Sequence, residues 1–484
     1  MATVNDAPED SPLSHPGLYT DLYELTMAQG YWSEGRDDSP ATFDYFFRSN
    51  PFDGGYVIFA GLERLLDYLE GLSFGAEELE YLSDIGLSGD FLESFADFEF
   101  TAEVCAPQPG EVIFPLEPVV RVHGSILEAQ LIETALLNLL NFESLVATKA
   151  SRMRQVAGDS KLIDFGLRRA QGYGGLQASR GAVIGGFDAT SNCLAAFLDD
   201  LEASGTQAHS WIQSYDSELE AFRAYARTFP DSTILLVDTY DTLDSGVPNA
   251  IKVAREMEAQ GHRLKGIRLD SGDLAYLSKK ARTMLDDAGL EYVKIAASNQ
   301  LDEHVIRSLR AQDAPIDVFG VGTQLVTAND DPALDGVYKL SSVDGEHRIK
   351  LSENPEKINF PGLKQVWRLT DANGQFYGDI VGLDGEFDGE SPTGRMYDPA
   401  HPTARNVSVD GYDAEPLLEP VMRDGARLLD RRTTREIAAY ARERLAKLPA
   451  EHRRFENPHI YKVGLSERLL RARDEAMSAH QSDG

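Results

Sequence analysis

Two short apolar runs of this chain end in the same way, Thr233-Ile-Leu-Leu-Val-Asp238 and Gly266-Ile-Arg-Leu-Asp270. Runs of this kind recur from residue 161 to residue 320, and helical stretches such as 253–260 and 274–288 separate most of them. The others are Lys161-Leu-Ile-Asp-Phe165, Ala182-Val-Ile-Gly-Gly-Phe187, Tyr292-Val-Lys-Ile-Ala296 and Ile316-Asp-Val-Phe-Gly320. Strand and helix alternating in this manner favour a parallel sheet, and so many units in succession predict an irregular, TIM-like α/β barrel.

Polar or small residues follow the strands of this predicted barrel. Asp238 and Asp270 end two of them, and Arg168-Arg169, Ser298-Asn299 and Gly320-Val-Gly322-Thr323 follow others. Any one such residue is often a plain helix N-cap. In α/β barrels, however, catalytic groups gather at the carboxyl ends of the strands, so the whole set predicts a single pocket.

The residue types in this set suit a substrate that carries phosphate. The guanidinium groups of Arg168, Arg169 and Arg268 match phosphate and carboxylate oxygens in bidentate fashion. The turns Gly320-Val-Gly322-Thr323 and Ser271-Gly272-Asp273 offer backbone N–H groups that no side chain obstructs. We therefore predict a site for a phosphorylated sugar with a diphosphate. The chain has neither a Gly-x-Gly-x-x-Gly dinucleotide fingerprint nor a Walker A loop.

One histidine stands close to these strands in the sequence, within Gly205-Thr206-Gln-Ala-His209-Ser-Trp211. Its residue type leaves several roles open: a general base, a metal ligand, a carrier of a phosphoryl group, or a core residue with both ring nitrogens satisfied. Asp238 and Asp270 leave two roles open as well, because their carboxylates could hold Mg²⁺ through water or orient His209.

The 484 residues carry a formal net charge of −33, and the sequence pI is near 4.6. Such a surface repels nucleic acid and anionic membranes, so we expect neither as a partner. The acidic excess suits solubility at high salt and favours a halophilic source, with an acidic protein of an ordinary cytoplasm as the alternative. Cys105 and Cys193 lack Cys-x-x-Cys spacing, which argues against disulfides and a cysteine-bound zinc. A polar start and the lack of an apolar run of spanning length predict a soluble, cytoplasmic protein.

The length and the changes of pattern predict several domains. Residues 1–16 are expected to be a disordered lead-in, and 17–150 a first domain that ends in a long helix over 124–153. Residues 151–345 form the predicted barrel, and 346–484 an extension that packs on the first two domains. The extension is turn-rich, with a hairpin signal at Ala372-Asn373-Gly374 and a charged amphipathic helix over 433–448.

Several motifs of this chain occur together in one known family. They are Thr20-Asp-Leu-Tyr23, Ile163-Asp-Phe-Gly-Leu-Arg-Arg-Ala-Gln-Gly172, Gly185-Gly-Phe-Asp-Ala-Thr-Ser-Asn192, Gly205-Thr-x-Ala-His209, Val237-Asp-Thr-Tyr240, Ile267-Arg-Leu-Asp-Ser-Gly-Asp273, Gly320-Val-Gly-Thr323 and Asn457-Pro-His-x-Tyr461. Over nearly its whole length the chain resembles the nicotinate phosphoribosyltransferase family. The resemblance implies an enzyme of NAD biosynthesis that makes nicotinate mononucleotide and diphosphate from nicotinate and phosphoribosyl diphosphate, with Mg²⁺ and coupled ATP hydrolysis. It also implies an N-terminal α/β sandwich domain, an irregular α/β barrel, a C-terminal extension and a homodimer with shared active sites.

The resemblance also implies roles for individual residues. His209 matches the histidine that ATP phosphorylates, and Asp238 would orient it. The other assignments are Tyr23 of the partner subunit against the pyridine ring, Thr206 and Arg268 for nicotinate, Arg168 and the catalytic Asp270 for the sugar diphosphate, Thr323 for the ribose 5-phosphate, and Ser298 and Gly322 for substrate in the same pocket. Asp188 also falls near this site, where a further carboxylate costs energy, so we expect it to turn away or to pair with an arginine.

Two other functions compete with this interpretation. A nicotinamide phosphoribosyltransferase would share most of the motifs, although the Thr20–Tyr23 opening and the surroundings of Arg268 fit the acid better. A non-catalytic relative that binds nucleotide would be expected to lack His209, Asp270 or Arg168, and all three are present.

Overall fold

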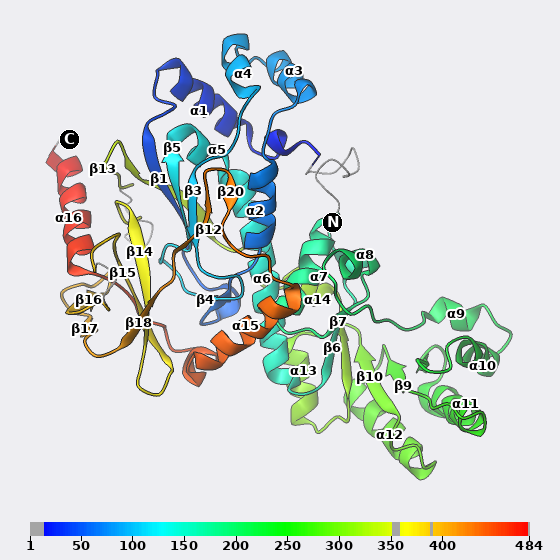
Figure 1. Cartoon of the computed structure of the whole chain (residues 1–484). Helices are drawn as coiled ribbons and strands as arrows, with labels where there is room; N and C mark the ends of the chain where they lie inside the picture. The colour runs from blue at the N-terminus through cyan, green and yellow to red at the C-terminus, as the bar shows by residue number, and fades with distance from the viewer. Residues whose placement is uncertain (1–13, 351–358, 388–390, 483–484) are drawn as a thin grey trace. The chain divides into compact units, whose positions relative to one another are not determined.

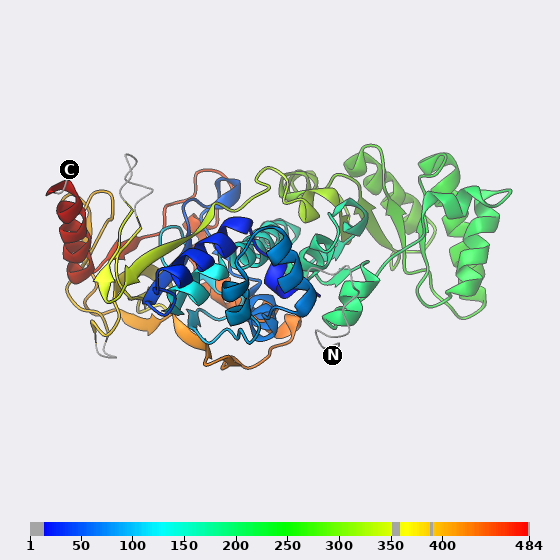
Figure 2. The same cartoon turned by 90° about the horizontal axis from the view of Figure 1, so that it is seen from above.

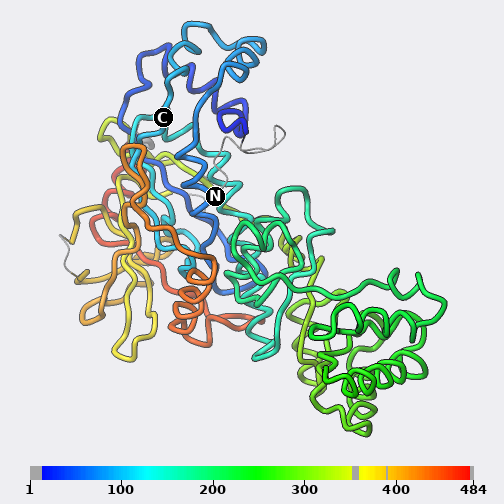
Figure 3. Tube along the Cα trace, turned by 45° about the vertical axis from the view of Figure 1, so that its right-hand side comes forward, coloured from blue at the N-terminus to red at the C-terminus, as the bar shows by residue number. Residues whose placement is uncertain are grey.

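A computed structural model of the chain describes residues 14–350, 359–387 and 391–482. The chain forms two compact units: unit 1 comprises Met1–Leu145, Ala333–Arg432 and Ala439–Gly484, and unit 2 comprises Val146–Pro332 and Thr433–Ala438. Figure 3 lets the reader follow how the blue and the yellow-to-red parts of the chain together build unit 1. Most of the predicted lead-in lies outside the described residues, but Pro16, its last residue, is buried and begins the 3-10 helix η2 (Pro16–Leu18).

Unit 2 is built on a six-stranded parallel sheet with the order β7-β6-β11-β10-β9-β8. Its strands are β6 (Lys161–Asp164), β7 (Ala189–Thr190), β8 (Ile234–Leu236), β9 (Gly266–Leu269), β10 (Lys294–Ser298) and β11 (Val318–Val321). Every neighbouring pair is parallel. This order is that of a barrel in which β11 lies next to β6. Among the described residues no ladder joins the edge strands β7 and β8, so the predicted parallel α/β sheet is confirmed and its closure is not seen.

One predicted strand of unit 2 is wrong. The run from Ala182 to Phe187 lies at the end of helix α7 (Gly174–Ile184) and in the turn after it, and the strand is the shorter β7. Small residues explain the difference, because they let the end of α7 approach helix α6 (Glu133–Ala157) closely. A Cβ on Gly185 would lie 2.2 Å from the carbonyl oxygen of Ala147 on that helix.

Helices cover the parallel sheet and fix the loops that leave it. The main helices of unit 2 are α10 (Glu218–Thr228), α11 (Val247–Ala259), α12 (Leu274–Asp287) and α13 (Glu303–Ala311), with the short α8 (Cys193–Leu198), α9 (His209–Gln213) and α14 (Thr323–Val326) (Figures 1 and 2). Apolar side chains of β8 and β9, such as Leu235 and Ile267, pack with Val253 and Leu285 of these helices in one core. Asp273 caps α12 by accepting a hydrogen bond from the Tyr276 N–H, so this strand-end residue has a structural role.

Unit 1 contains a seven-stranded antiparallel sheet with the order β13-β12-β1-β5-β3-β19-β20. The strands are β1 (Pro40–Phe47), β3 (Glu103–Ala106), β5 (Val120–Ser125), β12 (Gly336–Val343), β13 (Glu346–His347), β19 (Glu419–Arg423) and β20 (Ala426–Arg427). The helices of its N-terminal part are α1 (Leu22–Ser33), α2 (Leu62–Gly71), α3 (Ala76–Asp84), α4 (Gly89–Phe95), α5 (Ile126–Leu131) and the first half of α6. The predicted long helix over 124–153 is thus two helices with a break at Ile132.

The extension adds a second sheet to unit 1, with the order β17-β16-β21-β15-β14-β18. Its strands are β14 (Lys364–Thr370), β15 (Phe376–Leu383), β16 (Arg395–Tyr397), β17 (Asn406–Ser408), β18 (Asp413–Pro416) and β21 (Val463–Leu465), and its helices are α15 (Thr434–Lys447) and α16 (Glu467–Ser482). The hairpin predicted at Ala372-Asn373-Gly374 joins β14 to β15, and Gly374 adopts the positive φ that the turn requires. Throughout the described ranges, every helix is too short or too polar to cross a bilayer.

Candidate active site

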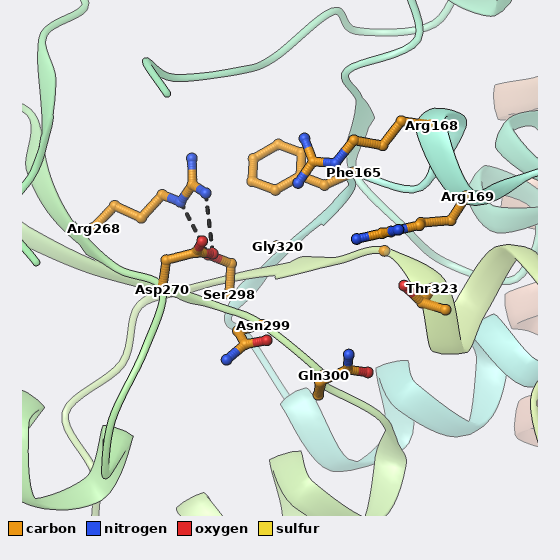
Figure 4. Close-up of a pocket in the computed structure, with 11 residues that line it drawn as sticks. Phe165, Arg168, Arg169, Arg268, Asp270, Ser298, Asn299, Gln300, Gly320 and Thr323 are labelled. Atoms are coloured by element: carbon orange, nitrogen blue, oxygen red, sulfur yellow. Dashed lines mark hydrogen bonds and ion pairs between the residues drawn. The ribbon is translucent and has the colours of Figure 1, made fainter. Parts of the chain in front are cut away.

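The loops at the carboxyl ends of the parallel strands of unit 2 line an open pocket of about 180 Å³. Figure 4 shows Arg268, Asp270 and Ser298 on one side of it and Arg168, Arg169 and Thr323 on the other. The lining residues are Phe165, Arg168, Arg169, Arg268, Asp270, Ser298, Asn299, Gln300, Gly320, Gly322 and Thr323. Residues far apart in sequence thus meet at one edge of the sheet, as the strand-end pattern predicted.

Arg268 is the most heavily bonded of the three arginines. Its Nε donates to Ser298 Oγ at 2.9 Å and one Nη2 hydrogen to Asp270 Oδ1 at 3.0 Å. Its Nη1 donates to Thr206 Oγ1 at 2.7 Å and to the Gln207 carbonyl at 3.3 Å. These contacts use four of the five N–H donors of a guanidinium group, which leaves one Nη2 hydrogen for a ligand. The predicted grouping of Thr206, Arg268 and Ser298 is therefore a real cluster with a fixed geometry.

Asp270 is held as an anion between Arg268 and Ser298. The Ser298 hydroxyl donates a short hydrogen bond to the same carboxylate oxygen that Arg268 contacts. Burial alone would raise the pKa of Asp270, but the hydrogen bond from Ser298 and the positive charge of Arg268 outweigh it and hold this pKa below its usual value. Asp270 is therefore a carboxylate at neutral pH.

His209 lies at the first position of α9, and both of its ring nitrogens have partners. Nδ1 is 3.0 Å from Thr239 Oγ1, and Nε2 is 3.6 Å from Asp270 Oδ2. The negative charge of Asp270, although too far for a hydrogen bond, favours the tautomer with a proton on Nε2 and a lone pair on Nδ1. The ring is partly exposed, which excludes the alternative of a fully buried core histidine.

The hydrogen bonds of Asp238 go to the loop that follows β9. Its Oδ2 accepts hydrogen bonds from the Asp270 N–H at 2.7 Å and the Ser271 hydroxyl at 2.7 Å. Asp238 thus fixes the backbone of the neighbouring loop, while Thr239 and Asp270 contact the histidine.

The other side of the pocket is a short turn that presents Arg168 and Arg169 to solvent. They lie in the 3-10 helix η4 (Leu167–Arg169), directly after β6. Buried Asp164 anchors this turn, because its carboxylate accepts hydrogen bonds from the Gly166 N–H at 2.8 Å and from the hydroxyls of Ser179 and Thr190, both at 2.7 Å. Burial raises the pKa of Asp164, against the lowering effect of these hydrogen bonds.

The ring of Phe165 lies against the glycine turn on this side. A Cβ on Gly320 would come within 2.4 Å of that ring, so a larger residue there would have to displace the ring. The Arg268 guanidinium lies 5.5 Å from the centre of the same ring. The sequence placed Phe165 in a strand motif and gave it no role in the site. Asn299 and Gln300, which also line the pocket, both have positive φ, a strain that the sequence did not reveal.

Asp188 and Tyr23, like Thr206, His209 and Asp238, are not among the residues that line the pocket. Asp188 pairs with Arg154 at 2.5 Å and also accepts the Leu162 N–H at 2.7 Å, so the expected pairing with an arginine is confirmed. Tyr23 lies on α1 in unit 1, where 47% of its surface is exposed.

The local charge of the pocket is opposite to that of the whole chain. Its lining contains three arginines and one aspartate, whereas the sequence has a net charge of −33. A positive pocket with glycine turns suits a ligand that carries several negative charges. Among the described residues, no group of three or more His, Cys, Asp or Glu side chains is placed to hold a metal ion.

The fold and the pocket define an α/β enzyme site for an anionic, phosphorylated substrate. Three family models match this chain: the nicotinate phosphoribosyltransferase N-terminal domain over residues 18–141, the nicotinate phosphoribosyltransferase family over 160–373, and its C-terminal domain over 363–473. The chain therefore belongs to the nicotinate phosphoribosyltransferase family, which confirms the resemblance drawn from its motifs.

Individual relatives agree with this assignment. The chain is 45% identical over 459 residues to nicotinate phosphoribosyltransferase of Bacillus subtilis, with 93% of each protein covered. It is 42% identical to nicotinate phosphoribosyltransferase pncB2 of Mycobacterium tuberculosis, covering 94% of this chain and 92% of the relative. The crystal structure of human nicotinic acid phosphoribosyltransferase matches with a TM-score of 0.85 at 32% identity, covering 94% of this chain and 99% of that one. At 24% identity, a nicotinate-nucleotide pyrophosphorylase from Pyrococcus furiosus shares the fold with a TM-score of 0.70.

Proposed function

We propose that this chain transfers the phosphoribosyl group of phosphoribosyl diphosphate to nicotinate, giving nicotinate mononucleotide and diphosphate for NAD biosynthesis. The observation that carries the proposal is the pocket in which Arg168, Arg169 and Arg268 meet the glycine turn of β11. The substrates bring a diphosphate, a 5-phosphate and a carboxylate, and this pocket supplies the complementary charge.

The geometry supports a division of the pocket between the two substrates. The free Nη2 hydrogen of Arg268 and the adjoining hydroxyls of Thr206 and Ser298 suit the nicotinate carboxylate. Arg168 and Arg169, with the backbone at Gly322 and the side chain of Thr323, suit the phosphates of the sugar. In the transfer, the C1–O bond to diphosphate breaks, positive charge builds on the ribose, and the pyridine nitrogen forms the new C1–N bond. The arginines neutralise the charge on the departing diphosphate, so catalysis is electrostatic stabilisation with positioning.

His209 is the proposed link to ATP. Its Nδ1 lone pair, opposite the Nε2–H that faces Asp270, would attack the γ-phosphorus while the bond to the ADP oxygen breaks. The Asp270 carboxylate then stabilises the positive charge that the phosphorylated ring carries at Nε2–H. Water returns the phosphoryl group to solution as phosphate, and the histidine is restored for the next cycle.

A magnesium ion belongs to the proposal, and the donor set fits a partly protein-bound ion. Asp238 Oδ1 is buried and, in the described parts of the chain, has no hydrogen-bond partner, so this oxygen can bind a cation. Mg²⁺ usually keeps several waters and takes one or two carboxylates together with substrate phosphates. When bound, it would neutralise charge on the diphosphate. Asp238 and Asp270 are the residues of this chain that would hold it.

We also propose a homodimer whose active sites use both subunits. Helix α1 exposes Tyr23 together with Leu22 and Met27, which form an apolar surface on this helix. A second copy would cover this surface and place Tyr23 against the pyridine ring in the partner's pocket. Sedimentation at several concentrations tests the dimer, and a stable monomer with full activity would exclude it.

The function is tested by turnover of nicotinate with phosphoribosyl diphosphate, with and without ATP, beside nicotinamide at equal concentration. We expect nicotinate mononucleotide, little product from nicotinamide, and stimulation by ATP. His209→Ala should fold normally, lose ATP hydrolysis and phosphorylation, and keep a weak transfer without ATP, because the arginines remain. Mass spectrometry at alkaline pH should find the acid-labile phosphate on His209 of the wild type. Full ATP stimulation in His209→Ala would move the phosphoacceptor elsewhere.

A further inference from the structure

Thr239 makes the shortest contact of the His209 ring, and neither the sequence nor the proposed mechanism had given it a role. Its Oγ1 lies 3.0 Å from Nδ1, the nitrogen that carries the lone pair when Nε2–H faces Asp270. In the Nε2–H tautomer, which the charge of Asp270 favours, the Thr239 hydroxyl donates its hydrogen to Nδ1. The two nitrogens of one imidazole are thus held by two different loops.

The backbone that carries Thr239 is fixed on both sides. Before it, the Val237 N–H donates to the Arg268 carbonyl at 3.1 Å, and the Asp238 carboxylate accepts the Asp270 N–H and the Ser271 hydroxyl. After it, Asp241 caps the π-helix η5 (Thr242–Gly246) by accepting the N–H groups of Leu243 and Asp244. The hydroxyl of Thr239 is therefore a preorganised donor, not the tip of a loose loop.

His209 needs such support because its own element is short. It begins α9, a five-residue helix whose N-cap Ala208 makes no side-chain hydrogen bond. Its side chain is 38% exposed, so packing alone does not fix the ring. A misplacement of about 1 Å of a reacting group lowers rates by about 100-fold in enzymes that depend on positioning.

We propose that Thr239 is a positioning residue for the phosphoacceptor His209. Together with Asp270, its hydroxyl stabilises the Nε2–H tautomer, and it fixes the orientation of the ring until the Nδ1 lone pair attacks the γ-phosphorus. When the N–P bond forms and the bond to the ADP oxygen breaks, the hydroxyl turns from the nitrogen to a phosphoryl oxygen. This inference rests on the proposed coupling to ATP, and it predicts that Thr239 affects that coupling far more than the transfer of the phosphoribosyl group.

The test compares Thr239→Val, which keeps the shape and removes the donor, with Thr239→Ser, which keeps the donor. Rapid-quench measurement with γ-labelled ATP gives the rate of phosphoenzyme formation in the full-length protein. We expect a fall of about 10- to 100-fold in Thr239→Val, recovery to within about 3-fold of wild type in Thr239→Ser, and a change of less than about 3-fold in the transfer without ATP. Thr239→Ala serves in the same way if the valine variant does not fold.

A second readout does not depend on turnover. Nitrogen-15 NMR of histidine-labelled protein reports the tautomer of His209, identified by comparison with His209→Ala. The wild type should show a proton on Nε2, and Thr239→Val a mixture of both tautomers. Phosphorylation at the wild-type rate in Thr239→Val, or an equal loss in the valine and serine variants, would overturn the proposal while the coupling itself stands. A wild type that forms no phosphoenzyme would overturn the coupling, and the role of Thr239 with it.

Discussion

Replacement of Arg268 by lysine keeps the positive charge and removes the planar geometry of the guanidinium group. In the structure that group bonds Thr206, Ser298 and Asp270 from three different nitrogens. A lysine ammonium is a point donor on a flexible stem, so it can keep the contact with Asp270 but not all three. The nicotinate carboxylate then meets a displaced cation and hydroxyls that have lost their partner.

The magnitude follows from the contacts that are lost. A hydrogen bond to a charged group contributes about 1.5–3 kcal/mol. One or two such bonds in a partly buried site give a loss of about 2–4 kcal/mol, which corresponds to a rise of about 30- to 1,000-fold in the KM for nicotinate. The KM for phosphoribosyl diphosphate should rise less, because Arg168 and Arg169 remain. Because lysine keeps a positive charge beside Asp270, the pKa of Asp270 should stay low and the acidic limb of the pH–rate profile should move little.

Initial rates with each substrate varied in turn provide the measurement. Arg223→Lys is a matched control, since Arg223 forms an ion pair with Glu256 at 2.6 Å on the helical surface of the same unit, away from the pocket lining. That variant should retain the wild-type kinetics. An unchanged KM for nicotinate in Arg268→Lys, with a raised KM for the sugar diphosphate, would refute the division of the pocket.

Three further perturbations test other parts of the molecule. In Gly320→Ala the new Cβ must displace the Phe165 ring from 2.4 Å, so kcat/KM should fall by at least about 10-fold. Gly89→Ala on α4, whose Cβ meets open space, should retain activity, and equal kinetics in both variants would contradict the steric argument. Burial raises the pKa of Glu24 from 4.5 to about 7, because the folded protein disfavours the charged carboxylate. The free energy of unfolding therefore falls as the pH rises from 4.5 to 7. At pH 8.5 Glu24→Gln should therefore be more stable than the wild type, by up to about 3 kcal/mol in the free energy of unfolding, and should unfold at a higher temperature. Below pH 4.5 the two proteins should be equally stable. If their stabilities change with pH in parallel, Glu24 has no such role. Finally, the acidic surplus predicts loss of activity and of the proposed dimer in dilute salt, which activity and mass measurements from low to molar KCl will check.

The sequence predicted the sheet and most of the pocket because both follow from local patterns. A buried parallel strand is a short apolar run, and the residue after it lies at the edge where loops converge. This rule alone predicts that Arg168, Asp270, Ser298 and Thr323 meet, and all four line the pocket. It failed for residues 182–187, where an apolar run with two glycines suits the end of a closely packed helix equally well.

The partners of individual side chains were not predictable in the same way. The rule places Asp238 and Asp270 at one edge of the sheet, but it does not predict the direction in which either carboxylate points. Whether Asp238 reaches His209 or the backbone of the next loop depends on shifts of a few ångströms between β8 and β9. The same holds for Asp164, whose three hydrogen-bond partners are Gly166, Ser179 and Thr190, and whose sequence context is that of a plain strand residue.

The contrast between the acidic chain and its positive pocket has a physical explanation. Charges separated by more than about 8–10 Å are largely screened at ordinary ionic strength, so a bound diphosphate responds mainly to its neighbours. Those neighbours are Arg168, Arg169 and Arg268, and the single carboxylate among them is already paired with Arg268. The three arginines therefore determine anion binding in the pocket more than distant acidic residues of the surface do. Salt weakens the long-range repulsion from the surface more than the short-range attraction in the pocket, so the affinity for the sugar diphosphate should fall less steeply with salt than it does in a relative with a neutral surface.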